Sequence, residues 1–326
     1  GAPTPDEMAA LRSAWVAEHL PRLDWTHLWA DDTEEEWIVE PILAARRLVA
    51  LYSAPKVGKS LLMLEIAAAI GAGRPMFGYP GGGTPRRTLY VDFENDPRGD
   101  TRARLIDMGY GPADLDNLVM LSFPTMAGLD SDLGGQQLMA AVHHYGCEVV
   151  VIDTVSRAVK GEENENDTWL AFYRSTGLRL KQAGVALIRL DHSGKDATKG
   201  QRGGSAKSGD VDAIWQLRKV DDDILELECD GARFPIPEQR LTLRRLEGPL
   251  RHEVDGLAWK KARDEMLDKL AAAGVPRGQR VTVREATDML KAAKITFTKS
   301  RLTRPVLERY AGLPATWSAE PLDGAP

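Results

Sequence analysis

The chain has 326 residues, of which 43% are hydrophobic and 28% charged, and its formal net charge is −6. This composition is typical of a folded globular protein and excludes collagen-like, low-complexity and largely disordered chains. No run approaches the ~20 apolar residues of a membrane helix. Two cysteines are too few for a disulfide scaffold or a four-cysteine zinc site. Without a recognisable signal peptide, we expect a cytoplasmic protein with no membrane partner.

The charge is unevenly distributed along the chain. Residues 1–40 hold 2 Lys/Arg and 10 Asp/Glu, a net charge of −8. Residues 259–310 hold 13 Lys/Arg and 6 Asp/Glu, a net charge of +7. A basic segment of this kind favours a nucleic-acid contact, although two solvated helical faces would give the same asymmetry.

The pattern along the chain predicts three parts. Residues 1–36 are expected to form an acidic helical arm, amphipathic over 8–20. Residues 37–256 alternate apolar strands with helices, which indicates an α/β fold with a mostly parallel sheet covered by helices on both faces. The strands of this core are expected at 48–52, 88–93, 118–121, 148–153 and 185–191, and its helices at about 61–73, 99–108, 133–145 and 169–182. Three further strands, at 213–217, 224–228 and 241–245, are expected to close the sheet in antiparallel fashion.

Residues 257–326 form the third part, a small basic helical domain. A helix over 258–273 is expected to end at Gly274, followed by a short strand at 279–281. Thr282 and Glu285 match a capping box and start a second helix. Thr298 is expected to cap a third helix, with Pro305 as an internal break. Helices with a tight connection in a basic segment predict a helix-turn-helix or winged-helix module; the alternative is a plain helical cap on the core.

The strongest chemical signal is the segment SAPKVGKS between a predicted strand and a predicted helix. This is the context of a phosphate-binding loop, in which main-chain N–H groups surround an anion. Lys59 can reach the β- and γ-phosphates of ATP, and the Ser60 hydroxyl can bind Mg²⁺. The loop departs from the usual motif at its first position, where Ser53 replaces glycine. The candidate nucleotide-binding residues are Ser53, Ala54, Pro55, Lys56, Val57, Gly58, Lys59, Ser60 and Leu61.

Two carboxylates follow apolar strands. Asp153 ends the run VVVID, where a carboxylate can hold Mg²⁺ beside the phosphates, and Thr154 comes next. Glu94 ends the strand after the phosphate-binding loop and can polarise the attacking water. Asp92 competes for this role, and we favour Glu94 because it lies nearer the carboxyl end of the strand.

A polar, glycine-rich segment follows the strand at 185–191. His192 at the strand end can sense the γ-phosphate. Lys195, Arg202 and Lys207 are candidates for a cation that stabilises transition-state charge in a neighbouring subunit, with Arg202 first and Lys195 second. The same cations could instead contact nucleic-acid phosphates, or be solvated loop residues.

Taken together, SAPKVGKS, LYVDFEND, VVVIDT, Glu163-Asn164 and DHSGKD…RGGSAKSGDVD resemble the RecA-like AAA_25 ATPases, a group similar to the hexameric plasmid replicative helicase RepA. The resemblance covers about residues 37–246. It implies a hexameric ring with ATP and Mg²⁺ at subunit interfaces. Lys59 and Ser60 would bind phosphate and Mg²⁺, Asp153 would be the Walker B carboxylate and Glu94 the catalytic base.

The resemblance also implies a γ-phosphate sensor at His192 and a finger acting across the subunit interface at Arg202 or Lys195. One of Arg98, Arg102 and Arg104 would contact adenine, and we assign this role to Arg102.

These observations predict a ring-forming ATPase that acts on single- or double-stranded DNA, as a helicase or as a replication or recombination motor. The alternative is a RecA-like ATPase that regulates or assembles protein partners and binds DNA weakly. The acidic arm and the overall negative charge favour this alternative. A small-molecule kinase is a weaker third hypothesis.

Overall fold

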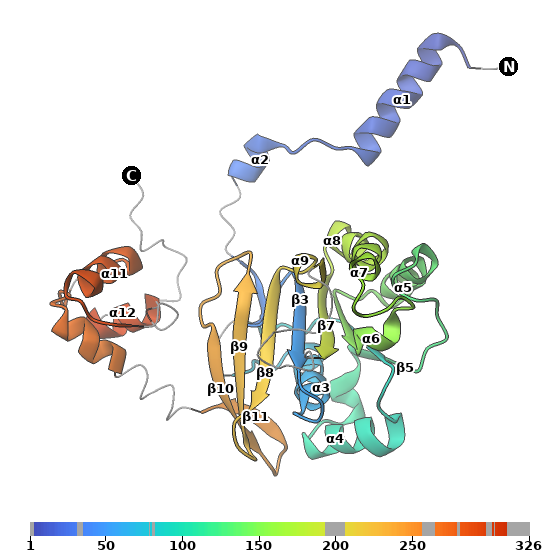
Figure 1. Ribbon diagram of the computed structural model, residues 1–326. Helices are drawn as coiled ribbons and strands as arrows, with labels where there is room; N and C mark the ends of the chain where they lie inside the picture. Colours follow the sequence, from blue (N-terminus) through green and yellow to red (C-terminus); the bar gives the residue numbers. More distant parts are fainter. Residues whose placement is uncertain are drawn as a thin grey trace. The chain divides into compact units, whose positions relative to one another are not determined.

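The computed structural model describes residues 3–30, 35–77, 79, 82–192, 206–255, 265–278, 281–297, 302 and 304–311. The chain divides into two compact units, Gly1–Glu35 and Glu36–Pro326 (Figure 1). The boundary that we expected at residue 256 stays a prediction. None of the helices in the described ranges is long and apolar enough to cross a bilayer.

The described residues of the first unit form two helices. Thr4 and Glu7 form a capping box at the start of α1 (Pro5–His19), and the carboxylate of Asp24 caps α2 (Trp25–Trp29). Neither helix buries a residue. The apolar side chains of the arm are therefore left exposed, and Trp29 is 82% accessible.

The second unit is built on one large sheet. Among the described residues nine strands pair in the order β11-β10-β9-β8-β3-β7-β6-β4-β5. From β8 to β5 every neighbouring pair is parallel, and from β8 to β11 every pair is antiparallel. The parallel strands are β3 (Leu48–Ser53), β4 (Thr88–Asp92), β5 (Leu118–Ser122), β6 (Val149–Asp153), β7 (Ala186–His192) and β8 (Ala213–Lys219). The others are β9 (Ile224–Ala232), β10 (Arg240–Leu246) and β11 (Arg251–Val254).

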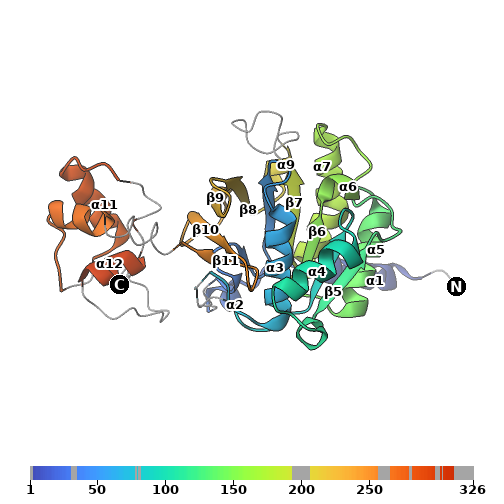
Figure 2. The same ribbon diagram turned by 90° about the horizontal axis from the view of Figure 1, so that it is seen from below.

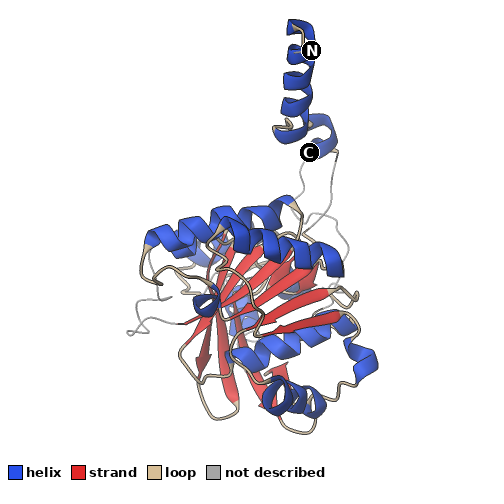
Figure 3. Ribbon diagram, turned by 90° about the vertical axis from the view of Figure 1, so that its right-hand side faces the viewer, coloured by secondary structure: helices blue, strands red, loops and turns tan. Residues whose placement is uncertain are grey.

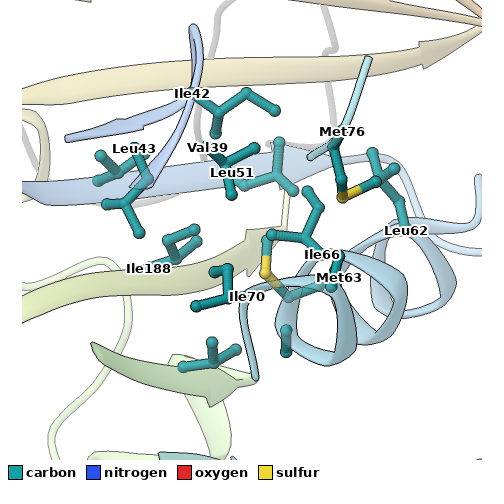
Figure 4. Packing of buried hydrophobic residues seen from close by; sticks show 14 of the residues in the cluster. Val39, Ile42, Leu43, Leu51, Leu62, Met63, Ile66, Ile70, Met76 and Ile188 are labelled. Carbon is teal, nitrogen blue, oxygen red and sulfur yellow. The ribbon is translucent and has the colours of Figure 1, made fainter. Parts of the chain in front are cut away.

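Helices cover both faces of this sheet (Figures 2 and 3). Val49 and Leu51 of β3 belong to one buried cluster with α3 (Lys59–Ala72) and α4 (Arg102–Asp107). Leu48 and Ala50 belong to a second cluster with α5 (Asp132–Tyr145), α7 (Asn166–Phe172) and α8 (Leu178–Gln182). Figure 4 shows Met63, Ile66 and Ile70 of α3 packed toward Leu51 and Ile188, with Leu62 beside Met76. The expected α/β class with a mostly parallel, helix-covered sheet is confirmed, and it is consistent with a RecA-like core.

Several details differ from the sequence-based expectation. The strand β8 joins β3 in parallel, so the antiparallel part starts only at β9. A hairpin of β1 (Trp37–Val39) and β2 (Leu43–Ala44) and the strand β11 were missed, because each is only two to four residues long. A π-helical turn, Tyr173–Gly177, links α7 to α8, and another, Pro97–Thr101, precedes α4.

The described residues of the basic tail, 257–326, form three helical segments around an apolar cluster of their own. The segments are residues 265–272, α11 (Val283–Ala292) and α12 (Arg304–Ala311), and the cluster includes Met266, Leu270, Leu290 and Leu307.

The capping box of Thr282 and Glu285 is confirmed. Val281 is not in a strand, and Thr298 lies outside the described residues. Pro305 is the second residue of α12 and not an internal break, because the helix begins at Arg304. Residues 298–301 and 303, between α11 and α12, also lie outside the described residues, so the tight connection stays a prediction.

Candidate active site

The predicted phosphate-binding loop joins β3 to α3. Ser53 is the buried last residue of β3, and its hydroxyl donates to the carbonyl oxygen of Ala54 at 2.8 Å. Gly58 caps α3 with a φ of 107°. A Cβ atom there would meet nothing within 4 Å, so the position favours glycine because of its backbone conformation and not because of space. The first N–H groups of α3 lack partners within the helix and can bind an anion.

A cavity of about 440 Å³ opens beside this loop. It is lined by Ser53, Ala54, Pro55, Lys56, Gly58, Lys59, Ser60, Leu61, Glu94, Asn95, Arg104 and His192. The structure thus brings together most of the residues singled out in the sequence. Val57 packs instead against the apolar core. Arg102 is exposed and does not line the cavity, whereas Arg104 does.

Lys59 is buried at the start of α3. Its ammonium group donates to the main-chain carbonyl oxygen of Asp191 at 2.7 Å. Burial lowers the pKa of Lys59, and the carboxylates of Asp153, Asp191 and Glu94 oppose this shift. The side chain is therefore a desolvated cation at the floor of the cavity, where an anionic ligand would interact with it strongly.

Asp153 ends β6 beneath Ser60. Its Oδ1 accepts a hydrogen bond from the Ser60 hydroxyl at 3.2 Å, and its Oδ2 accepts one from the Tyr90 hydroxyl at 2.8 Å. Burial raises the pKa of Asp153 to about 6, against these two hydrogen bonds, which lower it. Hydroxyl and carboxylate oxygens are ligands that suit Mg²⁺, which usually binds one or two carboxylates together with substrate phosphates. Ser60 and Asp153 therefore fit a magnesium ion.

The structure distinguishes Glu94 from Asp92. The Oδ1 atom of Asp92 accepts the main-chain N–H groups of Glu94 and Asn95, at 2.9 and 3.0 Å, and the side chain is buried. Asp92 thus holds the turn after β4. Glu94 lines the cavity, and its Oε1 accepts a hydrogen bond from the Thr154 hydroxyl at 3.1 Å. Of the two carboxylates, Glu94 is the one placed to reach a bound substrate.

His192 is the last residue of β7 and lines the cavity. Its Nε2 atom lies 4.0 Å from Oε1 of Glu94. Burial and the nearby Lys59 lower the pKa of His192, so the neutral imidazole is favoured at neutral pH. Two other candidates, Lys195 and Arg202, lie outside the described residues.

Lys207, the third candidate cation of the glycine-rich segment, is buried and unsuited to act in a neighbouring subunit. Its ammonium group pairs with Asp191 at 2.9 Å and Glu163 at 3.1 Å, and lies 4.0 Å from the ring centroid of Trp169. The guanidinium of Arg189 joins the same network through Asp191 and Asp210. The expectation of a solvent-exposed cation at Lys207 is wrong, because the short helix α9 (Ala206–Gly209) carries it back against the core.

Sequence reasoning missed two residues that complete the site, Asn95 and Tyr90, and it named Arg104 only as an alternative to Arg102 for the contact with adenine. Asn95 and Arg104 line the cavity, and Tyr90 holds Asp153 from beneath. Tyr90 and Asp153 stand on neighbouring strands, and β4 pairs with β6 in parallel register. The contact between Tyr90 and Asp153 could have been predicted only if β4 were known to lie beside β6, and the sequence does not reveal the order of the strands in the sheet.

The raised pKa of Asp153 predicts a pH-dependent gain in stability for Asp153→Asn without Mg²⁺. An ordinary aspartate ionises near pH 4 in the unfolded chain, whereas folded Asp153 ionises with a pKa of about 6. Ionisation therefore costs the folded state stability as pH rises from 4 to 6, and the cost persists above 6. Urea unfolding in EDTA at pH 8 should show the variant more stable by on the order of 2 to 3 kcal/mol.

This advantage should vanish below about pH 3, where Asp153 is protonated in both states. The control is Asp114→Asn, because the Gly111 N–H group lowers the pKa of Asp114 and the effect should have the opposite sign. An Asp153→Asn variant that is less stable than the parent at pH 8 would contradict the account.

Comparison with known proteins agrees with this geometry. The AAA_25 family, described as an AAA domain, matches residues 16–198. No curated protein compared with the chain gives a significant match. The family match spans more than half of the chain, and it includes the phosphate-binding loop, Glu94, Asp153 and His192. The chain therefore belongs to the AAA_25 family of RecA-like AAA-domain ATPases.

Proposed function

We propose that the protein hydrolyses ATP with Mg²⁺ at the cavity beside α3. The observation that carries this proposal is that Lys59, Ser60 and Glu94 line one cavity, with Asp153 hydrogen-bonded to Ser60 beneath it. A cation, a hydroxyl, a carboxylate suited to a metal ion and a glutamate facing the cavity are the groups that phosphoryl transfer to water requires.

Each side chain has a distinct role in this proposal. The N–H groups of the loop and the ammonium of Lys59 bind the β- and γ-phosphates, and Lys59 exchanges the Asp191 carbonyl for a phosphate oxygen. Ser60 and Asp153 hold Mg²⁺, which offsets the negative charge of the triphosphate. Glu94, oriented by the Thr154 hydroxyl, accepts a proton from the attacking water. His192, close to Glu94, is placed to contact the γ-phosphate.

The roles of Glu94 and Lys59 predict different defects. Glu94→Gln keeps the size and the hydrogen-bonding capacity of the side chain but removes the base, so nucleotide binding should persist while kcat falls about 10²- to 10⁴-fold. Lys59→Ala should lose both nucleotide binding and hydrolysis. Fluorescent ADP binding and steady-state phosphate release separate the two variants. Hydrolysis by Glu94→Gln at the parental rate would refute the assignment of the base.

We further propose that the ATPase acts on DNA as a motor, and that the basic tail provides the contact. Residues 259–310 carry a net charge of +7, from 13 Lys/Arg and 6 Asp/Glu. Within the tail, α11 buries Ala286 and Leu290 and exposes Arg284 and Lys291. Exposed cations on a short helix are suited to contact the phosphate backbone.

Reversing the charge of two cations on α11 tests this proposal. Arg284→Glu with Lys291→Glu should weaken binding to single- or double-stranded DNA at least about tenfold at about 50 mM salt, and should flatten the salt dependence. The control reverses Lys160 and Arg174, two exposed cations of the core. Equal DNA affinity for the parent and the α11 variant would refute the tail as the contact.

We propose that copies of the chain assemble into a ring through the N-terminal arm. The arm exposes Met8, Leu11, Trp15, Leu20, Leu23, Trp25, Leu28 and Trp29. Exposed apolar surface on this scale marks an interaction site. The family match begins at residue 16, inside α1, so the second half of the arm lies within the matched range, and we propose a surface of a second copy as its partner.

The arm proposal predicts that its tryptophans determine the oligomeric state. Electron microscopy and light scattering with a non-hydrolysable ATP analogue should show rings for the parent chain. Replacing Trp15, Trp25 and Trp29 together by Ser should give mainly monomers, because the apolar contact area is lost. A monomeric parent chain, or rings that survive the replacement, would refute the proposal.

The alternative function is a RecA-like ATPase that regulates or assembles protein partners. Its support is the negative total charge and the acidic arm, with 2 Lys/Arg against 10 Asp/Glu in residues 1–40. The DNA-binding measurement distinguishes the two, since this alternative expects no DNA binding even at low salt.

A further inference from the structure

Asn95, the residue after Glu94, contacts three charged side chains of the cavity. Its Nδ2 atom lies 3.1 Å from both carboxylate oxygens of Asp92 and 3.4 Å from Oδ2 of Asp153. Its Oδ1 atom accepts a hydrogen bond from Nη1 of Arg104 at 3.0 Å. One amide group thus bridges the carboxylate assigned to Mg²⁺ and a guanidinium that lines the cavity.

The two carboxylates need such a donor between them. Asp92 and Asp153 stand opposite each other on β4 and β6, which pair in parallel register. Both are buried, and like charges in a poorly solvated site repel each other. The Nδ2 group carries two hydrogens, so it can donate to both carboxylates at once.

Arg104 fixes the orientation of this amide. A guanidinium offers only donors, so it requires the amide oxygen, while the carboxylates require the amide nitrogen. With Oδ1 toward Arg104, both hydrogens of Nδ2 are directed to Asp92 and Asp153. The flipped amide would place its oxygen against the carboxylates.

We propose that Asn95 is a positioning residue that holds the carboxylate of Asp153 in the orientation that binds Mg²⁺, and that Arg104 keeps Asn95 in place. This inference rests on the proposed nucleotide site and adds a residue to it. Asn95 acts through Asp153 and does not itself contact Mg²⁺ or phosphate. A role limited to the turn after β4 would leave Mg²⁺ binding unchanged, because the main-chain N–H of Asn95 already holds that turn through Asp92.

The test measures how Mg²⁺ strengthens nucleotide binding, without relying on hydrolysis. Fluorescent ADP is titrated into the full-length protein in EDTA and at rising MgCl₂. Asn95→Ala should raise the Mg²⁺ concentration at half-effect about three- to tenfold, the size expected for the net loss of one ordinary hydrogen bond. Its affinity for ADP in EDTA should stay within about twofold of the parent, because the phosphate-binding loop is intact.

Two further variants keep the test decisive. Asn117→Ala removes a comparable hydrogen bond, to the carbonyl oxygen of Gly71 at 3.1 Å, away from the cavity, and should leave the Mg²⁺ midpoint unchanged. Arg104→Ala leaves the amide but frees its orientation, so it should raise the midpoint and also weaken binding in EDTA.

A midpoint for Asn95→Ala within twofold of the parent overturns the inference. If Asn95→Ala does not fold, an unchanged midpoint in Arg104→Ala overturns it. The proposed function itself is contradicted if the parent chain binds no ADP, or if its affinity for ADP does not change with Mg²⁺ concentration.

Discussion

The ammonium group of Lys59 is a buried positive charge at the carboxyl end of β7, and its burial requires compensating partners among the residues around it. Its hydrogen bond to the Asp191 carbonyl links α3 to the end of β7. Asp191 is in turn held by Arg189 and Lys207. Removing one partner from such a buried network leaves an uncompensated charge, which is strongly destabilising. The ligand that we propose, a triphosphate, would replace the carbonyl as the partner of Lys59.

The strand order explains why so many polar groups meet at one place. β3, β7, β6 and β4 are neighbours and parallel, so their carboxyl ends lie along the same edge of the sheet. The phosphate-binding loop, His192, Asp153 and Glu94 each follow one of these ends. Ligands of parallel sheets bind outside the carboxyl ends of the strands, where helix N-termini also point. Functional groups that are spread over 140 residues of sequence, from Ser53 to His192, therefore line one cavity.

The roles of residues that belong to a motif within one short segment could be predicted from the sequence. The roles of residues that act through contacts between neighbouring strands could not. The loop around Lys59 was recognised because its spacing and its strand-to-helix context lie within one short segment. Glu94 was preferred to Asp92 on its position in the sequence alone, and the turn geometry supplies the physical reason, because Asp92 ends β4 and binds the main-chain N–H groups of the turn. Asn95 and Arg104 carry no motif of their own, and their roles depend on β4 lying beside β6. Lys207 was misjudged because a glycine-rich segment gives no sign that its last turn packs on Trp169.

A crystal structure with Mg²⁺, ADP and beryllium fluoride tests the central claim most directly. We predict that the fluoride group, as a mimic of the γ-phosphate, lies in the cavity beside α3 and that the ammonium of Lys59 contacts it in place of the Asp191 carbonyl. The metal should lie beside Ser60 and Asp153, with Glu94 facing the fluoride group. Nucleotide bound elsewhere, or a Lys59 ammonium that stays 2.7 Å from the Asp191 oxygen with the site occupied, would contradict the account.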